Sequence, residues 1–260
     1  MCIFTGEVEA VSNTSIFARV NPAKEQYLAY EMAATLPEEM AMVLPLPTAG
    51  PRDVAVTFID LSGCPDLFTW LREAFEPASL GFDLDEASGS LSLDLLPVVD
   101  VGSFEASYVP QLKDFERLDP RFRLDATVWA QLPDYADYGF AVFKLKAGNL
   151  EVHPMGLKFT TRFPDHAFFP TVHVHHRTVP ERETFDHELY LQSEGEAGNE
   201  GWSGFLESPG PLGQIVPEGH DTGGMINPSR FGFRRVMKGI FPNQDVLVPI
   251  SPVPDFIARS

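Results

Sequence analysis

The sequence predicts a mainly β protein, either an antiparallel β-sandwich or an open barrel, with one or two short helices. Phe occurs 21 times, and both Pro (23) and Gly (20) are frequent, which favours short strands separated by turns. Apolar and polar residues alternate at the two-residue period of a strand in most segments, giving about ten strands against one clear helix.

The first 60 residues are expected to be strands. Residues 3–11 and 15–20 alternate on either side of Asn13-Thr14, which predicts a hairpin with its turn at that pair. Further strands are expected at 26–35, 41–46 and 53–60. Residues 41–46 are continuously apolar, as is typical of a buried strand.

The one clear helix begins at Cys64-Pro65-Asp66, because Pro suits the first helical position and Asp complements the N-terminal dipole. Pro77 ends it. Its apolar stripe at helical spacing comprises Leu67, Phe68, Leu71, Ala74 and Phe75. We interpret this stripe as core packing.

The rest of the chain also favours strands. Residues 79–97 are acidic and rich in turn residues, and we expect a solvated loop with a short strand at 90–95 in preference to a calcium site. A strand at 98–108 precedes a short helix that starts at Pro110. Residues 139–146 and 150–159 predict a hairpin, and the last strands are expected at 231–240 and 245–250.

Composition limits the class of protein. The formal net charge is −18, which repels nucleic-acid phosphates and anionic lipid, so neither a nucleic acid nor a membrane is an expected partner. With no signal sequence, no apolar span and two cysteines, we expect one cytoplasmic globular domain over 1–260, with a long surface loop at 193–224. Nucleotide-binding and common hydrolase motifs are absent from the sequence.

Histidines concentrate in one stretch. Residues 168–192 hold four of the seven, and we predict two strands joined by a polar turn at 177–184. On the first strand His173 and His175 share a face, and on the second His187 lies on the apolar face with Phe185 and Leu189.

This pattern predicts a mononuclear site for a divalent metal ion, zinc, copper or iron, held by His173, His175 and His187. His153 and Glu188 are alternative third ligands and candidate catalytic groups. Such a site would make the chain a hydrolytic or oxidative enzyme acting on a small molecule or a peptide. The equally weighted alternative is a solvent-facing pair of histidines beside a turn, with His187 and His153 bonded to backbone carbonyls. Metal-free acid–base use of the histidines is the remaining interpretation.

Two other functions stay open. If Met1 is removed, Cys2 carries a thiol beside a free amine, and it could be the nucleophile of an amide hydrolase. The chain could otherwise be a non-enzymatic binding or structural module whose Phe- and Pro-rich surface meets a protein partner.

Overall fold

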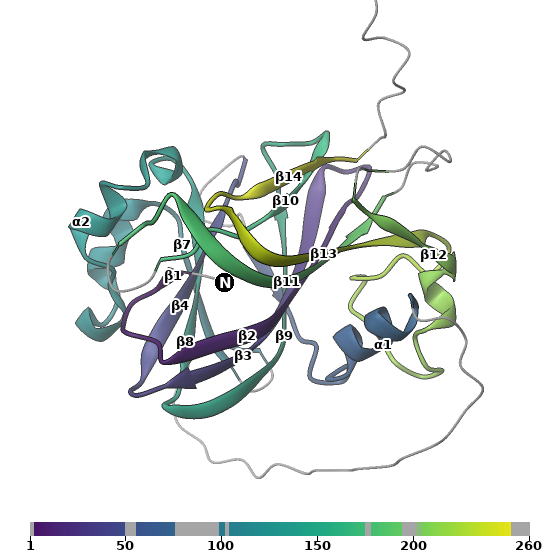
Figure 1. Cartoon of the computed structure of the whole chain (residues 1–260), viewed down its shortest axis with the longest axis horizontal. Coiled ribbons are helices and arrows are strands. Elements are labelled where there is room, and N and C mark those ends of the chain that lie inside the picture. The colour runs from purple at the N-terminus through teal and green to yellow at the C-terminus, as the bar shows by residue number, and fades with distance from the viewer. Residues whose placement is uncertain are drawn as a thin grey trace, which may run out of the picture.

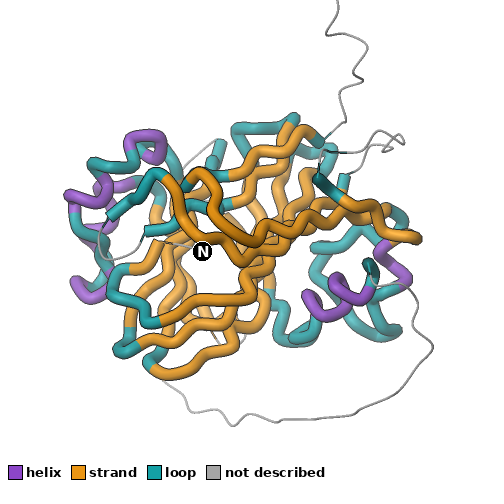
Figure 2. Tube along the Cα trace, in the orientation of Figure 1, coloured by secondary structure: helices purple, strands orange, loops and turns teal. Residues whose placement is uncertain are grey.

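The computed structural model describes residues 3–49, 56–75, 99–101, 104–174, 178–193, 202 and 204–250, with side chains throughout except at 99–101, 104 and 151–153. Within these residues the strands form three sheets, of seven, five and two strands. Strands fill the middle of the molecule, and the short helices lie at two of its sides (Figure 2). The predicted mainly β fold, with several antiparallel sheets and few short helices, is confirmed.

The larger sheet has the order β12-β13-β11-β2-β3-β9-β5. Its strands are β12 (Leu206–Pro211), β13 (Phe231–Pro242), β11 (Arg182–Gln192), β2 (Ala10–Val20), β3 (Glu25–Leu36), β9 (Gly148–Thr160) and β5 (Val56–Ile59). All neighbours are antiparallel except β11 and β2, which run parallel and pair from His187↔Thr14 to Gln192↔Arg19. This parallel pair joins two segments far apart in the sequence at the centre of the sheet.

The smaller sheets complete the β core. The five-stranded sheet has the order β1-β4-β8-β7-β6, and the two-stranded sheet pairs β10 with β14. Their strands are β1 (Ile3–Phe4), β4 (Met40–Leu46), β8 (Gly139–Leu145), β7 (Phe104–Val109), β6 (Val99–Val101), β10 (His166–Phe169) and β14 (Val246–Pro249).

Three apolar clusters fix the layers. The main cluster joins inward side chains of all three sheets, for example Ile16, Met42 and Phe169. A second covers the other face of the five-stranded sheet with α2 (Ala126–Trp129) and the 3-10 helices η2 (Leu112–Arg117), η3 (Pro120–Phe122) and η4 (Pro133–Tyr135). A third packs α1 (Leu67–Glu73) against the outer face of the larger sheet, so α1 and α2 lie on opposite sides of the molecule (Figure 1).

Two predicted hairpins are wrong in their pairing. Residues 10–20 form one strand that continues through Asn13, where a φ of 52° accompanies a β-bulge; Asn tolerates this left-handed conformation. The strands expected at 139–146 and 150–159 exist as β8 and β9, but β8 pairs with β4 and β7, whereas β9 pairs with β3 and β5. Alternation predicts strands, but it does not choose their partners.

The other elements agree more closely with the sequence. β3, β4, β13 and β14 match predicted strands, and α1 is the predicted helix, with Leu67, Phe68 and Leu71 buried. The strand expected at 90–95 lies outside the described residues. The described part of 193–224 includes β12 and the 3-10 helix η5 (Leu212–Gln214). Among the described residues, no helix is long and apolar enough to cross a bilayer.

One buried side chain ties the larger sheet to the two-stranded sheet. Gln26 on β3 is fully buried; its Nε2 donates to the Phe168 carbonyl oxygen at 2.6 Å, and its Oε1 accepts from the Phe168 N–H at 3.0 Å. We expect Gln26→Ala to lower the free energy of unfolding by about 2–5 kcal/mol, because two buried main-chain groups lose their partner. Urea denaturation measures this loss. The exposed Gln214→Ala is the control, and it should cost less than about 0.5 kcal/mol; equal effects of the two substitutions would contradict the assignment.

Candidate functional site

Two of the predicted ligands, His173 and His187, do come together. Their rings stack with centroids 5.1 Å apart, and Phe185 stacks on His173 at 4.4 Å. Both histidines are buried, with exposures of 0% and 1%. As predicted, His187 lies on the apolar face of its strand, where Phe185 and Leu189 are also buried. The cluster is therefore an aromatic stack inside the protein.

The route by which His173 arrives differs from the prediction. β10 ends at Phe169, and the chain then runs through Val174 without joining a regular strand, apart from a bridge between Val174 and Ile3. The two segments around the histidines therefore do not form a hairpin: β11 pairs with β13 and β2 instead.

Side chains from the β13–β14 turn hold this connecting segment. Asn243 accepts from the His173 N–H at 2.7 Å and donates to the carbonyl oxygens of His173 and Pro180 at 2.8 and 2.9 Å. Asp245 accepts from the N–H groups of Thr171 and Val172 at 2.9 and 3.2 Å. These bonds replace the strand partner that the segment lacks.

Burial and hydrogen bonding have opposite effects on the pKa of Asp245. Burial raises its pKa to about 6, although the bonds from Tyr135 and from the Thr171 and Val172 N–H groups oppose this rise. Burial, the positive charge of the N-terminus and the nearby His173 lower the pKa of His187 well below its ordinary value, with burial the largest cause. His187 is therefore a neutral imidazole at neutral pH.

Glu188 lies next to His187 in sequence but faces the other side of the sheet. Its carboxylate accepts from Arg234 at 2.7 Å and from the Tyr190 hydroxyl at 2.5 Å, and it lies 3.5 Å from Arg72 of α1. Arg72 also contacts Glu31 of β3 at 3.5 Å. Glu188 thus makes an ionic contact that fixes α1 on the sheet, and its predicted catalytic or ligand role stays a prediction.

The remaining predicted site residues do not join this cluster. Cys2 and His175 lie outside the described residues, so their predicted roles stay predictions; Ile3, which follows Cys2, is fully buried. His153 is on β9, two strands away from β2 in the sheet order, and its side chain is not described. In the described part of the chain, no three His, Cys, Asp or Glu side chains are grouped closely enough to hold a metal ion.

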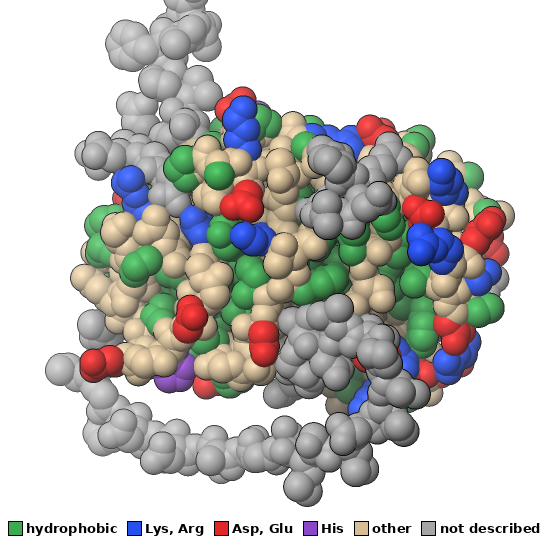
Figure 3. All heavy atoms as spheres, turned by 180° about the vertical axis from the view of Figure 1, so that it is seen from behind, with side chains coloured by type: hydrophobic (Ala, Val, Ile, Leu, Met, Phe, Trp, Pro, Cys, Tyr) green, Lys and Arg blue, Asp and Glu red, His purple; other side chains and the backbone are tan. Residues whose placement is uncertain are grey.

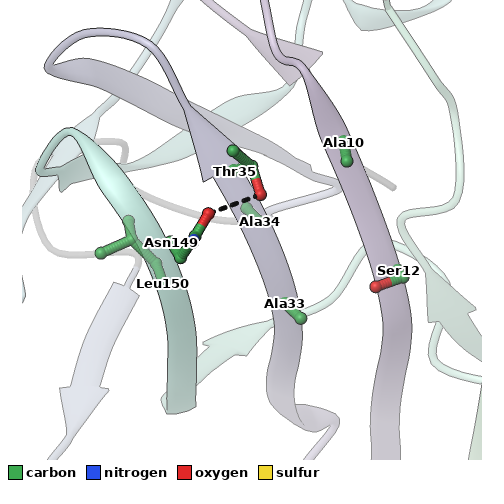
Figure 4. A pocket seen from close by; sticks show the side chains of 7 residues that line it. All are labelled: Ala10, Ser12, Ala33, Ala34, Thr35, Asn149 and Leu150. Carbon is green, nitrogen blue, oxygen red and sulfur yellow. Dashed lines mark hydrogen bonds between the residues drawn. The ribbon is translucent and has the colours of Figure 1, made fainter.

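Two hollows open near the start of β2. One, of about 430 Å³, is lined by His173 and His187 together with Val8, Glu9, Ala10, Val11, Thr14, Glu183, Thr184 and Asp186. The other, of about 490 Å³, lies over small side chains of β2, β3 and β9, where Thr35 donates to Asn149 at 3.0 Å (Figure 4). Ala10 lines both hollows.

Sequence reasoning missed the residues that position the histidines. Each of these residues bonds the main chain of a distant segment. The separation along the chain is 142 positions for Gln26, 70 for Asn243 and 74 for Asp245. For Gln26, the signal in the sequence is a polar residue at the start of the predicted strand 26–35. Asn243 and Asp245 lie at the end of a strand, where such residues are common in any turn.

The acid limb of the stability curve tests the state of His187. Because its pKa is lowered in the folded protein, the unfolded chain binds a proton first as pH falls below about 6.5, and stability is lost there. The free-energy advantage of the wild type over His187→Gln should therefore shrink by about 2 kcal/mol between pH 7 and pH 5. Urea titrations at several pH values measure it. The Asp245 contribution cancels in this difference. A constant difference would show that the pKa of His187 is the same in the folded and unfolded states, which would contradict the prediction.

The contact between Glu188 and α1 gives a second prediction. Glu188→Gln keeps the shape of the side chain but removes its charge, and we expect a loss of about 1–2 kcal/mol, because the arginine contacts are partly solvent-screened. Hydrogen exchange should rise in α1 before it rises in β3. The exposed Glu207→Gln on β12 is the matched control. Unchanged exchange in α1 of the Glu188→Gln variant would show that Glu188 does not hold this helix on the sheet.

Comparison with known proteins identifies the fold. No model of a protein family and no curated protein matches the chain. The crystal structure of baculovirus P35 is similar with a TM-score of 0.52 and 14% identity, over 95% of this chain and 99% of that one. Similar at lower scores are a mutated baculovirus P35 after caspase cleavage (TM-score 0.45, 12% identity, 92% and 99% covered) and the caspase-8/P35 complex (0.44, 12%, 92% and 96%).

These findings correct the predicted function. A metalloenzyme on a His-x-His strand is wrong as the main interpretation: the chain has the fold of P35, and His173 and His187, the two predicted ligands with described side chains, form a stack with Phe185. No three-ligand centre is found among the described residues. The alternative of a non-enzymatic binding or structural module fits the P35-like fold better.

Proposed function

We propose that this chain is a non-enzymatic protein that binds a cysteine peptidase of the caspase class in the cytoplasm. The observation that carries the proposal is the similarity to P35 over nearly the whole of both chains. P35 has been solved after caspase cleavage and in a complex with caspase-8. A peptidase partner fits an acidic chain for which nucleic acid is a poor partner.

We further propose that the peptidase meets residues 76–98. Caspases cleave after aspartate, and this segment contains Asp83, Asp85 and Asp94. It is bounded by two anchored elements: α1 ends just before it and is fixed by Arg72, and β6 begins just after it and pairs with β7. A segment held at both ends on a rigid scaffold is presented to a partner at a lower entropic cost than a free terminus.

The anchor of α1 supports this assignment independently of the comparison. Arg72 reaches both β3 and β11 from the last turn of a helix of only seven residues, and such a short helix gains its stability from tertiary contacts. The carboxyl end of α1, from which residues 76–98 continue, is thus the end that the arginine fixes.

Incubation of the purified chain with an active caspase tests the proposal. We expect inhibition of fluorogenic-peptide hydrolysis at micromolar protein, together with cleavage of the chain within 76–98, as mapped by mass spectrometry. Among Asp83→Ala, Asp85→Ala and Asp94→Ala, the variant at the cleaved aspartate should inhibit at least about tenfold less.

Asp134→Ala is the matched control, because Asp134 is an exposed aspartate in η4, outside this segment. It should inhibit as the wild type does. Absence of both inhibition and cleavage across initiator and effector caspases would contradict the proposal, and so would inhibition that none of the three variants weakens.

A further inference from the structure

The hollow over His173 and His187 lies where two strands separate. β2 and β11 pair only from Thr14 and His187 onward. Before that point β2 pairs on its other side with β3, and β11 pairs on its other side with β13. Among the described residues, the facing edges of 10–13 and 182–186 therefore have no strand between them, and we call this opening the β2–β11 slot.

A hydrogen bond crosses the slot. The Asn13 N–H donates to Asp186 Oδ2 at 3.1 Å, next to the bulge that bends β2 away from β11. Unpaired strand edges offer N–H and C=O groups to an incoming extended chain, which is how β-strand addition works.

Size and shape suit a short peptide. The hollow measures about 430 Å³, within the range of ligand sites of roughly 300–1,000 Å³. The five residues 182–186 span about 17 Å at the rise of a strand, which is long enough to pair with a few residues of a partner. Small side chains at Ala10 and Ser12 leave the second hollow open beside it (Figure 4).

Charge selects the peptide. The lining holds three carboxylates, Glu9, Glu183 and Asp186, and neither lysine nor arginine. Lys238 already pairs with Asp186 at 3.3 Å. Within the described residues neither Glu9 nor Glu183 has an ion-pair partner, so these two are available to a cation. Elsewhere acidic and basic side chains are interspersed, as on the face in Figure 3.

We infer that the β2–β11 slot binds an extended peptide carrying lysine or arginine at alternate positions, by strand addition to β2 or β11. In a strand, alternate side chains share a face, so cations at alternate positions can all meet the carboxylates of Glu9 and Glu183. None of the slot residues belongs to 76–98, and the inference goes beyond the proposed caspase binding.

Binding of defined peptides tests the inference. The probes are a fluorescein-labelled Lys-Val-Lys-Val-Lys peptide and the matched Glu-Val-Glu-Val-Glu peptide, measured by fluorescence anisotropy with the full chain. We expect saturable binding of the lysine peptide alone, weakened by added salt. Glu9→Lys and Glu183→Lys should each weaken it at least about fivefold. Glu207→Lys on β12 is the matched surface control and should leave binding unchanged.

Hydrogen exchange locates the peptide. Bound peptide should protect the amides of 10–13 or 182–186, and it should leave those of β12 unchanged. No binding by the wild type, equal binding of the two peptides, or protection elsewhere with both charge reversals silent would each overturn the inference. Caspase inhibition is a separate readout, which the Glu9→Lys variant should retain.

Discussion

A buried stretch of chain without a continuous strand partner is the constraint on which the middle of this molecule depends. Residues 168–174 lie inside, and each buried N–H and C=O there needs a partner. Gln26 serves Phe168, Asp245 serves Thr171 and Val172, and Asn243 serves His173. These side-chain to main-chain bonds join the larger sheet, through Gln26, to the two-stranded sheet and hold the segment that follows β10.

This arrangement explains why the histidines are structural in character. Asn243 fixes His173 from the β13–β14 turn, and the parallel pairing of β2 with β11 fixes His187. The two rings are thus stacked by the same turn and strand pairing that hold the sheets together. Neutral imidazoles suit the buried aromatic cluster with Phe185, because burial disfavours the charged form of a histidine.

Sequence alone could predict the strands, α1 and the apolar surroundings of His187, because these follow from local period and capping. It could not predict that β8 and β9 join different sheets, or that 10–20 is one strand, because pairing is decided by distant partners and by a tolerated left-handed Asn13. The metal centre was inferred from His173 and His175 on one strand face, yet residues 170–174 follow an irregular path that side chains impose. The residue types therefore indicate which side chains are candidates, but the sequence does not show which of them come together in space.

The outer face of the larger sheet holds α1 in place, whereas the slot opens on its inner side. On the outer face Glu188, Arg72 and Arg234 connect β11, α1 and β13, so the chain entering residues 76–98 starts from a fixed point. On the inner side the same strand β11 leaves β2 before His187 and opens the slot. His187 and Glu188 are consecutive on β11 but face opposite sides of the sheet. Arg72 also contacts Glu31 of β3, and β3 pairs with β2, which forms the other edge of the slot. Any coupling between binding at the proposed slot and binding at residues 76–98 should therefore pass through β11 or through β3 and β2.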